Sequence, residues 1–196
     1  AKEATVRITS FGCGGVVSGS GFVIGPGLVA TNAHVIAGVK RPIIKYKDRS
    51  YAGYPVLFNP NVDFAILRVK DLPAVPLDLV TDDIPVDTTV AVLGFPGGNF
   101  RLSAGKIHDN IILSGRNIYD LGIIDRDVYE IQTKVDSGNS GGPVITSDGR
   151  VAGVLFAKSD ADSSYGYAVT TKSLLNEINK GKTSTVRVGT GSCLAE

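Results

Sequence analysis

The sequence has few of the features that would indicate a membrane span, a metal site or a nucleic-acid partner. No apolar run approaches the roughly 18 to 20 residues that cross a bilayer. The formal net charge of +1 gives no overall attraction to nucleic acid or to an anionic membrane surface. The chain has only two cysteines and two histidines, and neither cysteine has a companion at zinc-ligand spacing. We therefore expect a soluble domain that needs no metal or other cofactor and binds no nucleic acid.

An initiator methionine and a signal peptide are also missing from the start of the chain. We interpret the chain as an excised or processed domain, and a membrane anchor upstream of Ala1 stays possible. The 196 residues are 43% hydrophobic and 20% charged, as in ordinary globular proteins. Glycine (24) and proline (9) are spread along the chain, which is typical of many short strands joined by turns.

The apolar pattern predicts an all-β fold with one late helix. Alternation over residues 4–10 and the hairpin at 22–30 are typical of half-buried strands. The proline- and aspartate-rich stretch 72–89 predicts a linker, so we divide the single domain into lobes at 1–80 and 88–170. Leu174, Leu175 and Ile178 share one helical face, which predicts a helix over 171–181 and then a tail over 182–196.

The two cysteines, Cys13 and Cys193, lie near opposite ends of the chain. Two free, buried thiols are the simpler interpretation for a cytosolic protein. A disulfide between them would close nearly the whole chain into a loop and stabilise it by roughly 5 kcal/mol at most. Such a bridge would also indicate an oxidising compartment. Titration of free thiols with and without reductant distinguishes the two.

The octet from Asp136 to Pro143 contains three glycines around Ser140. Such sequences are commonly surface turns, because glycine reaches positive φ without steric cost. The same backbone freedom would suit a loop that holds a nucleophilic serine. In that interpretation Gly138, Asn139 and Ser140 form the oxyanion segment, with the amides of Gly138 and Ser140 as donors.

The candidate base is one of two histidines. His108 lies in a polar segment, where an exposed imidazole is the ordinary interpretation, whereas His34 follows an apolar strand among small residues. Asp63 stands at the entrance of the buried strand from Phe64 and could be a simple turn residue. A carboxylate there could also hold the Nδ1–H of an imidazole. We therefore prefer His34 as the base and Asp63 as its partner.

The order of the candidate serine, histidine and aspartate along the chain distinguishes two hydrolase folds. Residues 138–142 also match the G-x-S-x-G motif of α/β-hydrolases, but in that fold the histidine follows the serine, and here none does. The order His34, Asp63, Ser140 resembles the chymotrypsin superfamily, as do the segments 31–35, 63–67 and 138–143. That resemblance implies two packed six-stranded antiparallel β-barrels, with a C-terminal helix, of the HtrA/DegP branch.

The segments 10–22 and 188–193 resemble the MarP family of actinobacterial membrane-anchored acid-resistance proteases. This resemblance implies a disulfide between Cys13 and Cys193, transmembrane helices upstream and a periplasmic location. It further implies a monomeric serine endopeptidase that cleaves cell-envelope proteins through an acyl-enzyme, in acid or oxidative stress. The alternative that stays open is a non-catalytic or latent peptide-binding or sensing domain on the same fold, which a fluorophosphonate probe would not label.

The specificity pocket is placed by analogy with the same fold. Its walls are expected from the segments 132–137, 156–158 and 165–167, and no acid can be assigned to its base. The two lysines in these segments are expected to be solvated. The candidate substrate-binding residues are Lys134, Val135, Ser137, Phe156, Ala157, Lys158 and Gly166. Because free imidazole titrates near pH ~6.5, a protease active in acid needs a lowered pKa at His34 or must work with a small active fraction.

Overall fold

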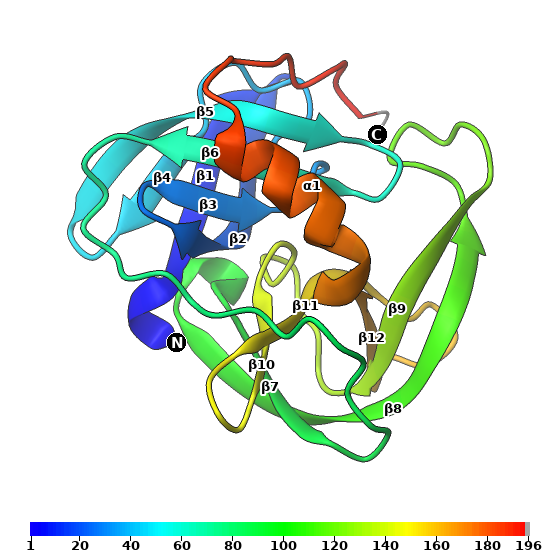
Figure 1. Cartoon of the computed structure of the whole chain (residues 1–196). Helices are drawn as coiled ribbons and strands as arrows, with labels where there is room; N and C mark the ends of the chain where they lie inside the picture. Colours follow the sequence, from blue (N-terminus) through cyan, green and yellow to red (C-terminus); the bar gives the residue numbers. More distant parts are fainter. Residues whose placement is uncertain (195–196) are drawn as a thin grey trace.

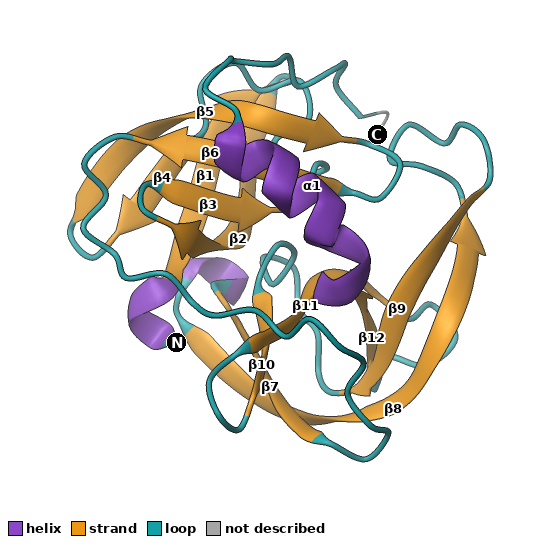
Figure 2. Ribbon diagram, viewed as in Figure 1, coloured by secondary structure: helices purple, strands orange, loops and turns teal. Residues whose placement is uncertain are grey.

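Two closed barrels, each of six antiparallel strands, make up most of the computed structural model, which describes residues 1–194 (Figure 1). One barrel is built from the first half of the chain and the other from the second half, and a single α-helix lies across both. Figure 2 shows that the remaining chain is loop, apart from two short 3-10 helices, η1 (Lys2–Ala4) and η2 (Pro96–Gly98). The prediction of a chymotrypsin-like double barrel is confirmed. Residues 195–196 of the predicted tail lie outside the described residues.

The N-terminal barrel closes in the order β1-β2-β3-β6-β5-β4. Its inward positions, such as Ile8, Val29, Ile44 and Leu67, are fully buried, because alternate residues of a strand point to the same side of the sheet. Its strands are β1 (Thr5–Gly12), β2 (Gly15–Gly25), β3 (Leu28–Thr31), β4 (Ile43–Tyr46), β5 (Arg49–Asn59) and β6 (Phe64–Val69).

The C-terminal barrel closes in the order β10-β11-β12-β9-β8-β7 around Val92, Ile131, Val144 and Leu155. The segment between the barrels carries no strand, but Leu79 bridges to Val151 of this barrel. Its strands are β7 (Thr89–Gly94), β8 (Arg101–Gly115), β9 (Ile124–Gln132), β10 (Pro143–Thr146), β11 (Val151–Lys158) and β12 (Tyr165–Thr170).

The helix α1 (Thr171–Thr183) fastens the two barrels together. Its N-cap is Thr170, whose side chain accepts a hydrogen bond from the amide of Ser173 at 3.2 Å. Its other end packs on the N-terminal barrel, where a Cβ at Gly181 would overlap Ile66 Cδ1. The helix ends at Thr183, two residues beyond the predicted end at Gly181. Gly181 serves close packing inside the helix instead of ending it. No helix within residues 1–194 has the length and apolar character needed to cross a bilayer.

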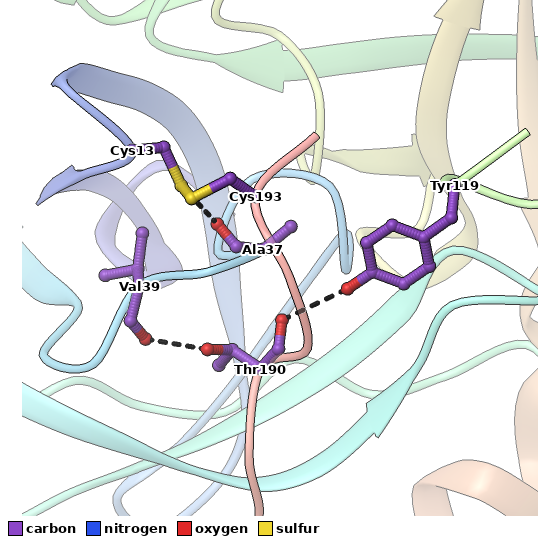
Figure 3. The surroundings of a disulfide bond; sticks show 6 residues. All are labelled: Cys13, Ala37, Val39, Tyr119, Thr190 and Cys193. Atoms are coloured by element: carbon purple, nitrogen blue, oxygen red, sulfur yellow. Dashed lines mark hydrogen bonds between the residues drawn. A yellow bond between two sulfur atoms is a disulfide. The ribbon is translucent and has the colours of Figure 1, made fainter. Parts of the chain in front are cut away.

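A disulfide joins Cys13 in the β1–β2 turn to Cys193 in the tail, so the predicted bridge is confirmed (Figure 3). The tail beside it is bound to the segment that follows His34. The amide of Gly38 donates to the carbonyl of Thr190 at 3.0 Å, and the Thr190 hydroxyl donates to the carbonyl of Val39 at 3.0 Å. From the C-terminal barrel, the Tyr119 hydroxyl donates to the same Thr190 carbonyl at 3.2 Å.

Candidate active site

His34 and Asp63 meet at one edge of the N-terminal barrel. Strands β3 and β6 are paired, and His34 lies three residues after β3 ends while Asp63 immediately precedes β6. The imidazole Nδ1 of His34 lies 2.6 Å from Asp63 Oδ2, and the backbone amide of His34 donates to Asp63 Oδ1 at 2.9 Å. Both carboxylate oxygens therefore hold the same histidine, which fixes the position and the tautomer of its ring.

The backbone at Asp63 is as constrained as its side chain. Asp63 is only 4% exposed and has φ of 54°, in the left-handed region that few residues other than glycine adopt. The side chain of Asn32 donates to the Asp63 carbonyl at 2.9 Å and helps to hold this conformation. A simple turn residue would not need a buried carboxylate with both oxygens engaged.

The surroundings of His34 act on its pKa in opposite directions. Burial is the largest single influence and lowers the pKa, because it disfavours the charged imidazolium. The charge of Asp63 and its hydrogen bond both raise the pKa, and together they outweigh burial, so the pKa of His34 is raised from 6.5. Of the two conditions for activity in acid, a lowered pKa at His34 is therefore not met.

Ser140 lies in a tight loop between β9 and β10. The amide of Gly141 donates to the carbonyl of Leu155 in β11 at 2.8 Å, and the amide of Gly142 donates to the carbonyl of Asn139 at 2.9 Å. Gly138 and Gly141 both have positive φ, of 99° and 81°. The Ser140 side chain is half-buried, and its hydroxyl makes no hydrogen bond within residues 1–194, to His34 or to any other residue.

The serine loop rests on the barrel that carries His34. The amide of Ser20 in β2 donates to the Ser140 carbonyl at 2.8 Å, and the Ser20 hydroxyl donates to the Gly138 carbonyl at 2.6 Å. A Cβ at Gly141 would overlap Ser20 O and Thr31 Oγ1 and would lie 3.1 Å from the amide nitrogen of Asn32. The loop thus abuts the end of β3, and the structure brings the Ser140 backbone beside the segment that leads to His34.

Two amides of this loop are free to bind an oxyanion. Among the described residues, neither the N–H of Gly138 nor that of Ser140 has a hydrogen-bond acceptor. The N–H of Asn139 instead donates to the Asp136 carbonyl at 3.1 Å. Asn139 therefore has no free N–H for an oxyanion, and within the predicted segment only the N–H groups of Gly138 and Ser140 are available.

A cavity of about 550 Å³ opens beside the serine loop. Of the residues proposed for substrate binding, Lys134, Val135 and Lys158 line it, whereas Ser137, Phe156, Ala157 and Gly166 are not among its lining residues. Both lysines are exposed at its wall. Among the described residues that line the cavity the one acid is Asp136, which pairs with Arg101 at 2.5 Å. The other lining residues are Gln132, Thr133, Ser163 and Ser164.

Arg126 is a charged group near the site that the sequence analysis missed. It is only 6% exposed, its guanidinium lies 5.9 Å from the centre of the Phe156 ring, and its Nη2 donates to the Arg116 carbonyl at 2.9 Å. Burial lowers the pKa of Arg126, and the charge of Asp63 raises it in partial compensation. A lone arginine in an ordinary strand gives no sequence signal for this position. Within the described chain no group of three acidic, histidine or cysteine residues could hold a metal ion.

Comparison with known proteins assigns the fold and the serine loop to one family. The model of the trypsin-like peptidase domain matches residues 19–154. The chain belongs to the trypsin-like peptidase family. Serine protease Rv3671c of Mycobacterium tuberculosis, which is MarP, is 39% identical over 99% of this chain and 50% of its own length. A probable periplasmic DegP-like serine endoprotease of Rickettsia conorii is 33% identical over 87% of this chain and 36% of its own. The predicted resemblance to HtrA and MarP proteases is thus confirmed.

Two crystal structures of Rv3671c differ in their likeness to this peptidase domain. The active form covers 99% of this chain and 87% of that chain, at 38% identity, with a TM-score of 0.96. An inactive form carrying a serine-to-alanine substitution covers 96% of this chain and 90% of that chain, at 37% identity, with a TM-score of 0.84. The chain spans about half the length of Rv3671c and about a third of the length of the Rickettsia relative.

Proposed function

We propose that this peptidase domain hydrolyses peptide bonds through a triad of His34, Asp63 and Ser140. The observation that carries the proposal is the His34–Asp63 pair, with both carboxylate oxygens engaged, beside a serine loop whose hydroxyl and two amides are free. The free hydroxyl supplies a nucleophile, the paired imidazole supplies a base, and the amides supply donors for an oxyanion.

In this mechanism His34 Nε2 accepts the proton of the Ser140 hydroxyl as Oγ attacks the peptide carbonyl. The negative oxygen of the tetrahedral intermediate accepts hydrogen bonds from the amides of Gly138 and Ser140. The C–N bond then breaks, and the leaving amine takes its proton from His34. A water molecule, deprotonated by His34, hydrolyses the resulting ester and restores the Ser140 hydroxyl. Asp63 stays ionised and stabilises the imidazolium in both stages.

The proposed resting conformation is the active one. It is supported by the higher TM-score against the active form of Rv3671c, 0.96 as against 0.84 for the inactive form. It is also supported by the N–H of Gly138, which has no acceptor among the described residues and is available to an oxyanion. Because catalytic hydrogen bonds of free enzymes are often long and shorten when substrate binds, we expect the bond from Ser140 to His34 to form with substrate.

We propose that the cavity beside the serine loop receives the side chain before the cleaved bond and disfavours lysine and arginine there. Lys134 and Lys158 line the cavity and pair with no carboxylate within residues 1–194, while Asp136 is already paired with Arg101. A cationic substrate side chain would therefore meet two like charges and no free acid.

The proposed location is supported by one relative, and the proposed biological role rests on the resemblance to MarP and HtrA proteases. We propose that the domain acts outside the cytoplasm on cell-envelope proteins, as part of a longer, membrane-tethered monomer, in acid or oxidative stress. The Rickettsia relative is a probable periplasmic endoprotease. The disulfide of this chain is typical of oxidising compartments. Because the pKa of His34 is raised, a role in acid requires the enzyme to work with the small fraction that has neutral His34.

The proposed activity and specificity are tested together by incubating the purified domain with a proteome-derived peptide library at mildly alkaline pH. We expect new peptide termini whose preceding residues are poor in lysine and arginine. Absence of cleavage under conditions where the domain is folded would contradict the activity. Cleavage mainly after lysine or arginine would contradict only the specificity.

A single methyl group at Gly138 is expected to damage the oxyanion site. In Gly138→Ala the new Cβ would lie 2.8 Å from the carbonyl oxygen of Phe95, at a φ of 99° that alanine rarely adopts. The loop must then turn away, and losing one oxyanion donor typically costs about 3 to 4 kcal/mol, or 10²- to 10³-fold in kcat. The assay is kcat on a fluorogenic peptide.

Gly149→Ala is the matched control for this substitution. Gly149 also has positive φ, of 87°, but a Cβ there would meet nothing within 4 Å. We expect this variant to lose about 1 kcal/mol of stability, because a residue with a Cβ is strained at positive φ, and to keep its kcat. Equal kcat in Gly138→Ala and the parent protein would remove Gly138 from the mechanism.

A further inference from the structure

A second hollow lies on another part of the molecule, where the two barrels meet near the N-terminus. It has a volume of about 260 Å³. Its apolar surface comes partly from Phe95 and Phe100, whose rings pack edge to face with centroids 5.7 Å apart. Its polar surface is mainly basic, from Lys2, Arg7, Lys45 and Lys47. We call this hollow the basic groove.

The positive charge of the basic groove is largely uncompensated. Its one acidic residue, Glu3, pairs with Lys47 at 2.9 Å. Lys2, Arg7 and Lys45 pair with no carboxylate in the part of the chain that the structure describes. The ammonium group of Lys2 lies over the ring of Phe100, 5.2 Å from its centre. An anion in the groove would therefore not have to displace a carboxylate from these three groups.

Two of these charges face each other across the sheet. Arg7 in β1 lies directly opposite Lys45 in β4, so their side chains leave the same face of the barrel. Like charges in this arrangement are destabilising. Arg7 has one weak acceptor, the carbonyl of Gly98 at 3.4 Å, and its Nε is buried with no hydrogen-bond partner among the described residues. Its guanidinium is positioned but poorly satisfied, which is the state that a bound carboxylate would relieve.

The row of cross-strand neighbours that includes Lys45 and Arg7 also connects the basic groove to the serine loop. The other cross-strand neighbour of Arg7 is Ser20 in β2. The Ser20 hydroxyl accepts a hydrogen bond from the amide of Phe95 at 2.9 Å and donates one to the Gly138 carbonyl at 2.6 Å. Phe95 thus lines the groove, and its backbone amide is linked to the Gly138 turn through the Ser20 hydroxyl.

We propose that the basic groove binds a small organic acid with an aromatic or branched apolar body, and that its occupancy stabilises the serine loop. The carboxylate bonds to Arg7 and Lys45, and the apolar body packs on Phe95 and Phe100. Because this ligand binds only the arrangement in which Phe95 and Arg7 line the groove, it favours the arrangement in which Gly138 is held by Ser20. The binding site is independent of the proposed catalytic mechanism, and only the effect on the serine loop rests on it.

Binding is tested by isothermal titration of the domain with 4-phenylbutyrate, and with the uncharged 4-phenylbutanamide as the matched ligand. We expect saturable one-to-one binding of the acid that weakens with added salt, and no saturable binding of the amide. Arg7→Gln should weaken binding about tenfold or more, the equivalent of one charge-assisted hydrogen bond. Lys45→Gln, at an exposed position, should weaken it several-fold without a change in folding, whereas Lys70→Gln removes an equal charge outside the groove and should bind as the parent does.

The effect on the serine loop is measured as the rate at which a fluorophosphonate labels Ser140, with and without saturating 4-phenylbutyrate. We expect faster labelling of the parent protein, and the same acceleration of Lys45→Gln only at a several-fold higher concentration of the acid. Absence of saturable binding, equal binding of acid and amide, or unchanged binding by both variants would overturn the site. Binding with an unchanged labelling rate would overturn the link to the loop. Failure of all labelling would count against the proposed mechanism and would leave the titration as an independent test of the site.

Discussion

Replacing Ser140 with alanine is expected to abolish peptide hydrolysis and to leave the fold unchanged. The substitution removes the proposed nucleophile, and such losses reach about 10⁶-fold in kcat in serine proteases. The Ser140 hydroxyl makes no hydrogen bond within the described residues, so its removal leaves no buried group without a partner. The measurements are kcat/KM on a fluorogenic peptide and the free energy of unfolding in denaturant.

Ser147→Ala is the control for Ser140→Ala, because it deletes the same hydroxyl from an exposed turn between β10 and β11. It should match the parent protein in both measurements. Hydrolysis by Ser140→Ala at the parent rate would exclude Ser140 as nucleophile. A large loss of stability in this variant would show that the hydroxyl has a structural role that its surroundings do not indicate.

Replacing Asp63 with asparagine is expected to lower kcat by about 10⁴-fold, since the amide of asparagine can hold the imidazole in the wrong tautomer. It should also move the pH dependence of the remaining activity. In the parent protein Asp63 raises the pKa of His34 from 6.5. Because the base must be neutral, kcat/KM rises with pH through a midpoint above this value. Without the Asp63 charge, burial is left as the main influence and lowers the pKa, so the midpoint falls.

The same pKa shift predicts the direction of a stability change. A histidine whose pKa is raised in the folded state adds stability that is fully present below its unfolded pKa, near pH ~6.5. This contribution is lost as the pH rises through the raised folded value. The difference in unfolding free energy between the parent protein and Asp63→Asn should therefore shrink from mildly acidic to alkaline pH.

Asp71→Asn is the matched control for both effects of Asp63→Asn. Asp71 has a similar positive φ, 57° against 54° at Asp63, but its side chain is exposed. This variant should keep the parent rate and the parent pH profile. If kcat/KM rose with pH through the same midpoint in Asp63→Asn and in the parent protein, Asp63 would not be what raises the pKa of His34.

Those parts of the fold that follow from local pattern could be predicted from the sequence. In β1, for example, Val6 and Ile8 are buried while Arg7 between them is half-buried, and this period of two residues is visible in the chain. The order of His34, Asp63 and Ser140 predicted the protease family, and the comparisons confirm that family. Asp63 was placed correctly before β6, but its left-handed φ depends on bonds to Asn32 and His34 that no local pattern encodes.

What the sequence did not reveal depends on contacts between the barrels. Ser20 is one small residue in a glycine-rich strand of the N-terminal barrel. Its hydroxyl nevertheless bonds across the interface to both Phe95 and Gly138 of the C-terminal half. Gly181 was interpreted as the end of the helix, whereas its missing side chain allows α1 to close on Ile66. The pairing of Asp136 with Arg101, a residue of β8, could not be seen in the sequence. Each of these depends on residues far away in the chain.

The central claim is that His34 activates Ser140, in a loop whose serine hydroxyl and two amides are left free for the substrate. It is tested most directly by treating the folded domain with a fluorophosphonate and locating the adduct by peptide mass spectrometry. We predict a single adduct on Ser140 in the parent protein, and labelling slowed by several orders of magnitude in His34→Ala. An adduct on another serine, no adduct at all, or labelling of His34→Ala at the parent rate would contradict the account.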